Sequence, residues 1–61
     1  MNPFTGQELE AAERAIASLL HKCKRAEEKL TAGTPQYTLM KNRIAALEIA
    51  LTLIQKQIQN P

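Results

Sequence analysis

The segment TAGTPQY, Thr31–Tyr37, decides the fold because it can end one helix and begin another. Gly33 can adopt the left-handed backbone conformation that commonly follows a helix. Thr34 is suited to cap the next helix, and Pro35 is suited to its first position. The segment therefore predicts a sharp turn at residues 33–34 between two helices.

The chain before this turn carries a clear signal for the start of a helix. In PFTGQEL, Thr5 is placed as the N-cap and Glu8 as its reciprocal partner, which makes a capping box. Phe4 and Leu9 stand at the spacing of a hydrophobic staple across the same cap. We therefore expect a first helix over about residues 6–32.

The chain after the turn predicts a second helix of nearly equal length, over about residues 35–60. Ala, Leu, Glu, Lys, Gln and Ile dominate the composition, and all but Ile favour helix strongly. A short connection between equal helices makes them antiparallel neighbours. The 61 residues are thus predicted to be a single all-α domain, residues 1–61, folded as a two-helix hairpin.

Both predicted helices carry apolar residues at alternating spacings of three and four, which is the seam of a coiled coil or helical bundle. The first seam is Leu9, Ala12, Ile16, Leu19, Cys23, Ala26 and Leu30. The second seam is Tyr37, Met40, Ile44, Leu47, Leu51, Ile54 and Ile58. Folding at Gly33 places Cys23 level with the turn of helix from Ile44 to Leu47.

The second helix carries more apolar side chains than one partner helix can cover. Its surplus forms a stripe beside the seam, which contains Leu39, Ala46, Ala50 and Leu53. Leu20 and Ile49 are further apolar residues outside both seams. We expect the stripe to contact a second copy, so that two hairpins form a homodimeric four-helix bundle or a higher oligomer. The alternative is that the stripe docks on a different protein.

No set of residues predicts catalysis, a cofactor site or a metal site. His21 and Cys23 are two apart on a helix, so their side chains point in different directions. One cysteine and one histidine cannot supply a structural zinc site. The lone cysteine indicates a reducing, cytoplasmic setting, and the apolar runs are too short for a membrane span.

Basic residues gather in the half of the hairpin nearest the turn, although the formal net charge is only +2. They are Lys22, Lys24, Arg25, Lys29, Lys41 and Arg43, opposed there by Glu27 and Glu28. This cluster could contact the phosphates of a nucleic acid. A solvated helix face is the favoured interpretation, because Tyr37 is the only aromatic residue nearby that could stack on bases.

In size and predicted architecture the chain resembles the plasmid RNA-binding Rop family, whose hairpins dimerise into four-helix bundles. That resemblance implies a dimer that binds nucleic acid. The chain is also similar in size to the small helical-hairpin phosphatases of sporulating bacteria. Their second helix carries Ser and Asp four residues apart, where this chain has Lys41 and Ala45. The catalytic carboxylate is missing, so the phosphatase activity is not carried over.

The sequence thus predicts a small, non-enzymatic module for oligomerisation or protein interaction, of the kind that serves as a regulatory adaptor. The alternative is a Rop-like bundle that binds nucleic acid through the basic half of the hairpin.

Overall fold

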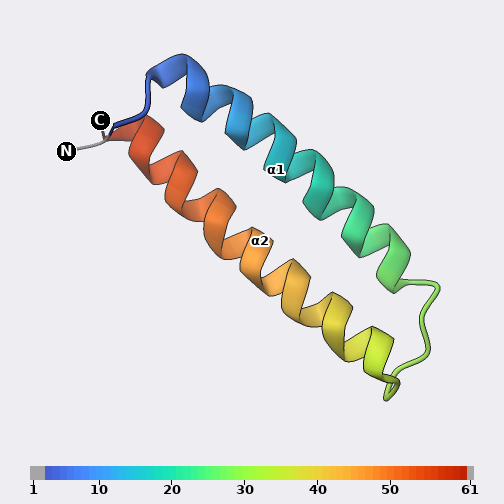
Figure 1. Cartoon of the computed structure of the whole chain (residues 1–61). Helices are drawn as coiled ribbons and strands as arrows, with labels where there is room; N and C mark the ends of the chain where they lie inside the picture. The colour runs from blue at the N-terminus through green and yellow to red at the C-terminus, as the bar shows by residue number, and fades with distance from the viewer. Residues whose placement is uncertain (1–2, 61) are drawn as a thin grey trace.

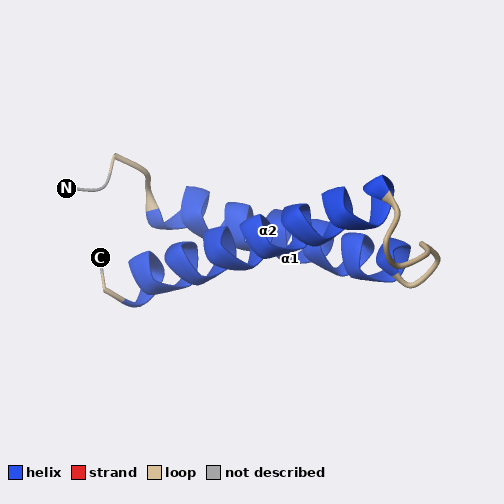
Figure 2. Ribbon diagram, turned by 90° about the horizontal axis from the view of Figure 1, so that it is seen from below, coloured by secondary structure: helices blue, strands red, loops and turns tan. Residues whose placement is uncertain are grey.

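The computed structural model describes residues 3–60 and shows two helices, α1 (Gly6–Glu27) and α2 (Pro35–Gln59). They run antiparallel, with the connecting loop at one end and the start of α1 and the end of α2 at the other (Figure 1). Seen from below, the helices cross at a shallow angle, as in a coiled coil (Figure 2). The predicted all-α hairpin is confirmed.

Both helices begin where their capping residues predict. The Thr5 backbone N–H donates to the Glu8 carboxylate at 2.9 Å, and the Glu8 backbone N–H donates to the Thr5 hydroxyl at 3.0 Å. At the second helix, the Tyr37 backbone N–H donates to the Thr34 hydroxyl at 3.2 Å. These bonds satisfy amide groups that would otherwise have no partner in the first turn.

The end of α1 differs from the prediction, because the helix stops at Glu27 and not near residue 32. The backbone N–H groups of Lys29 and Leu30 bond to carbonyls three residues back, at 3.1 and 3.0 Å, which tightens the chain into turns. Gly33 has a φ of +90°, so it does take the left-handed conformation expected of it. Residues 28–34 are used to cross from one helix axis to the other.

The core of the hairpin contains only two buried side chains among the described residues, Leu20 (9% exposed) and Ile44 (8% exposed). The prediction placed Leu19 in the seam and Leu20 outside it, and this assignment is wrong. Leu19 is 47% exposed. Leu19 is three residues after Ile16 and four before Cys23, whereas Leu20 is four after Ile16 and three before Cys23. Both spacings fit an apolar helix repeat, so the sequence alone could not decide which leucine is buried.

Two ion pairs join the helices along their shared edge. Lys24 Nζ lies 3.3 Å from Glu48 Oε2, and Lys41 Nζ lies 3.6 Å from Glu27 Oε2. Each pair links α1 to α2 and helps to hold them in register. Within residues 3–60, neither helix has the length and apolar character needed to cross a membrane.

Candidate interaction surface

The large apolar side chains that the hairpin leaves exposed are the main feature of its surface. They are Phe4, Leu19, Leu39 (50%), Ile49 (63%) and Leu53 (60%). Isolated apolar residues are ordinary on protein surfaces. Among residues 3–60 of this chain, however, more large apolar residues are exposed than buried.

A shallow groove runs between the helices on one side of the hairpin. Leu19 and Cys23 line it from α1, and Arg43, Ala46 and Leu47 line it from α2. The shared groove places Cys23 beside Leu47, as folding at Gly33 predicts. It also places Leu19 opposite the predicted stripe of α2, a neighbour that sequence reasoning missed because it had assigned Leu19 to the core.

The four predicted contact residues remain on the surface in varying degree. Leu39, Ala46 and Leu53 are exposed, and Ala50 is half-buried. Turning 100° per residue, a helix places all four on the flank of α2 that borders the groove. Leu19 shares the groove with Ala46. We group it with the four residues of this flank and call the set the apolar face: Leu19, Leu39, Ala46, Ala50 and Leu53.

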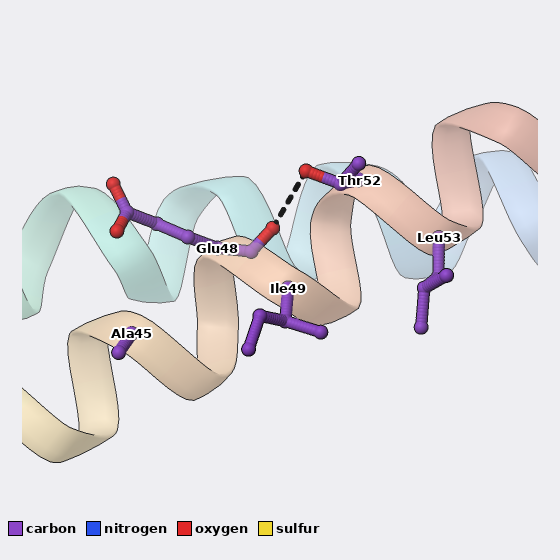
Figure 3. A pocket seen from close by; sticks show the side chains of 5 residues that line it. All are labelled: Ala45, Glu48, Ile49, Thr52 and Leu53. Carbon is purple, nitrogen blue, oxygen red and sulfur yellow. Dashed lines mark hydrogen bonds between the residues drawn. The ribbon is translucent and has the colours of Figure 1, made fainter.

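A second apolar patch adjoins this face on the outer side of α2. Ala45, Glu48, Ile49, Thr52 and Leu53 line a shallow depression there (Figure 3). Ile49 and Leu53 project in the same direction from the helix (Figure 3). The Thr52 hydroxyl donates to the Glu48 backbone carbonyl at 2.9 Å, so this polar group is satisfied within its own helix. The patch therefore presents mainly hydrocarbon.

A third hollow lies at the end of the hairpin that carries the chain ends. Phe4, Glu8, Leu9, Ala12 and Ile54 line it. Phe4 and Leu9 thus share a hollow, as the predicted staple across the helix start requires. Apolar surface consequently extends along much of the hairpin's length, and not only around the middle of α2.

The predicted basic cluster is partly neutralised by glutamates. Of its six residues, Lys24 and Lys41 form the ion pairs with Glu48 and Glu27, while Arg43 borders the groove. The Lys41 ammonium also lies 5.3 Å from the centre of the Tyr37 ring. The Tyr37 side chain and then the Glu27 carboxylate raise the pKa of Lys41 above its ordinary value.

The side chains with the most reactive chemistry are separated. His21 is exposed, whereas Cys23 is half-buried in the groove. Within the described range, no three His, Cys, Asp or Glu side chains gather into a group that could hold a metal ion. The features that stand out are therefore apolar area and charge distribution.

Comparison with known proteins found no relative of this chain. No protein-family model, no curated protein and no solved structure matches the chain. Function must therefore be inferred from the surface itself.

Proposed function

We propose that this chain is a non-enzymatic assembly module, in which two hairpins pack through their apolar faces to form a four-helix bundle. The observation that supports this most directly is the small core. Among residues 3–60, only Leu20 and Ile44 are buried, while Leu19, Leu39 and Leu53 on the apolar face remain in contact with water. A second layer of helices would supply the interior that the hairpin lacks.

The exposed area supports the same proposal. A compact monomer of 6.8 kDa exposes about 4,000 Å². This chain exposes 4823 Å². The excess, roughly 800 Å², is close to the area that each partner buries in a standard protein interface.

The elongated shape is consistent with a hairpin that packs against a second copy. The hairpin measures 41 × 17 × 15 Å, with a radius of gyration of 13.8 Å. A compact chain of this length has a radius of gyration of about 10–11 Å. Doubling the thin dimension by adding a second hairpin would bring the particle closer to globular proportions.

The energetic scale is large for so small a chain. Moving a leucine such as Leu39 or Leu53 out of water contributes roughly 1.5–3 kcal/mol. The whole net stability of a 61-residue chain is about 3–9 kcal/mol. Burying two or three such side chains in an interface would therefore change the folded population substantially.

The experiment that tests this function is a measurement of solution mass by sedimentation and light scattering over a range of concentrations. We expect a dimer, and we expect Leu39→Glu with Leu53→Glu to give monomers. The matched control is Ser18→Glu with Thr38→Glu, which adds the same charge at exposed positions outside the apolar face and should leave the dimer intact.

Two results would contradict the proposal. A folded wild-type monomer at every concentration would show that the apolar face does not mediate self-assembly, and a different protein would become the expected occupant. A dimer that survives both glutamate substitutions would show that the contact lies elsewhere on the hairpin.

A further inference from the structure

Charge is distributed unevenly along the hairpin. The half nearest the loop holds six cations and two anions: Lys22, Lys24, Arg25, Lys29, Lys41 and Arg43, with Glu27 and Glu28. The half nearest the chain ends holds four anions and two cations: Glu8, Glu10, Glu13 and Glu48, with Arg14 and Lys56. One end of the molecule is therefore net positive and the other net negative.

This asymmetry discriminates between the two ways of packing two hairpins face to face. If both loops lie at the same end, the positive halves face each other and so do the negative halves. If the loops lie at opposite ends, each positive half faces a negative one. Facing helices lie about 8–10 Å apart, which is close to the screening length of about 8 Å at physiological salt. The difference between the two arrangements therefore persists in solution.

When the two loops lie at opposite ends, which we call the head-to-tail arrangement, the apolar stripes of the two copies can overlap along their whole length. Ala46 lies next to the midpoint of α2, which spans Pro35–Gln59. Leu39 and Leu53 lie seven residues to either side, about 10.5 Å along the helix axis. A two-fold axis through Ala46 would thus bring Leu39 of one copy opposite Leu53 of the other.

The side chains at the centre of this arrangement are small. Ala46 would face its own copy across the two-fold axis, and Ala50 borders it on the same flank. On α1, Ala11 and Ala15 occupy the corresponding flank. Small residues let helix backbones approach closely, so the leucines on either side can interdigitate.

From the charge distribution and the centred stripe together, we infer that the partner of the apolar face is a second copy packed head to tail, with the two loops at opposite ends of the bundle. This inference rests on the proposed self-assembly. The new element is the relative orientation of the two hairpins, which is set by attraction between the positive half of one chain and the negative half of the other.

The test is a distance measurement between two nitroxide labels by pulsed electron paramagnetic resonance. In a Cys23→Ala background, a label is attached to Ala32→Cys in the loop. Head-to-tail packing places the two labels about one hairpin length apart, and that length is 41 Å. Packing with both loops at one end would place them less than about 20 Å apart, since neighbouring helix axes lie about 8–10 Å apart.

A second label at Ser18→Cys, an exposed position near the middle of α1, gives the control. Its distance is about 20–25 Å in either orientation, because it lies near mid-length and the axes are close. Thr31→Cys provides a second loop position with the same expectation as Ala32→Cys. Circular dichroism against the unlabelled chain checks that each labelled chain keeps its helices.

The outcomes separate the orientation from the self-assembly. A long distance from the loop with a short one from Ser18→Cys supports the head-to-tail bundle. Short distances from both positions overturn the orientation and leave the proposed function standing. An absence of dipolar coupling at both positions overturns the proposed function, and the inferred orientation with it.

Discussion

The ammonium of Lys24 on α1 lies 3.3 Å from the carboxylate of Glu48 on α2. Both side chains are about half exposed, at 53% and 52%. The pair joins the last turn of α1 to the middle of α2. Water and salt screen such an exposed pair, so its role is to favour one register more than to hold the fold together.

This pair should contribute little to stability. In a double-mutant cycle with Lys24→Met and Glu48→Gln, we expect a coupling free energy of about 0.2–1 kcal/mol, as is usual for exposed pairs. Urea denaturation of the four chains at one protein concentration measures it. A coupling of several kcal/mol would show that the pair is desolvated in the assembled protein.

Leu19→Ala and Leu20→Ala should have different effects although the residues are neighbours in sequence. Leu20 is buried within one hairpin, so its truncation should cost about 2 kcal/mol or more of unfolding free energy. Leu19→Ala should mainly raise the dissociation constant of the dimer. Thermal unfolding and sedimentation of both variants at matched concentrations separate the two effects, and equal loss of mass and stability in both would contradict this assignment.

The raised pKa of Lys41 predicts a pH-dependent contribution to stability. The folded state holds this proton more tightly than the unfolded state, whose pKa is close to the ordinary value of 10.5. The contribution is therefore present below that value and is lost as pH rises through the raised pKa. We expect Lys41→Met to lower the melting temperature below pH 10.5, with the difference from wild type shrinking as the pH rises through the raised pKa. A difference that stays constant through this range would count against the interaction with Tyr37 and Glu27.

Salt should weaken the dimer if its halves are complementary. Raising NaCl from about 0.05 M to about 0.5 M shortens the screening length from about 14 Å to about 4 Å. We expect the dissociation constant to rise several-fold in sedimentation experiments at these two concentrations. Packing with both loops at one end predicts the opposite sign, because screening would then relieve repulsion between like halves.

The alternative function, binding of a nucleic acid through the basic half of the hairpin, leads to a separate prediction. Any binding of RNA or DNA should fall steeply with salt, through counterion release. Replacing Lys22 and Arg25 by Gln should weaken it more than replacing Lys24 and Lys41, which already lie against glutamates. Titration of a labelled duplex by fluorescence anisotropy measures this, and no binding even at low salt would exclude the function.

The local signals in the sequence predicted most of the fold. Thr5, Glu8, Thr34 and Pro35 each mark a helix start where the structure has one, because capping depends only on neighbouring residues. The end of α1 was harder to predict. Residues 28–32 have no strong helix breaker, and they leave the helix because the chain has to cross to the axis of α2.

The apolar face could be predicted only in part, for a physical reason. The heptad pattern identified Leu39, Ala46, Ala50 and Leu53, since α2 has more apolar residues than one neighbour can cover. It could not choose between Leu19 and Leu20, which lie on either side of the seam direction. That choice depends on how α1 rotates about its axis to accommodate Ile44, which is a property of the packed pair of helices.

The start of α1 and the end of α2 both lie at the end of the hairpin away from the loop (Figure 1). In a head-to-tail bundle, the ends of the two copies would emerge at opposite poles. Any group joined to either end of the chain would then be held roughly one hairpin length, 41 Å, from its counterpart on the second copy. The bundle would act as a rigid spacer that displays two attached groups facing apart.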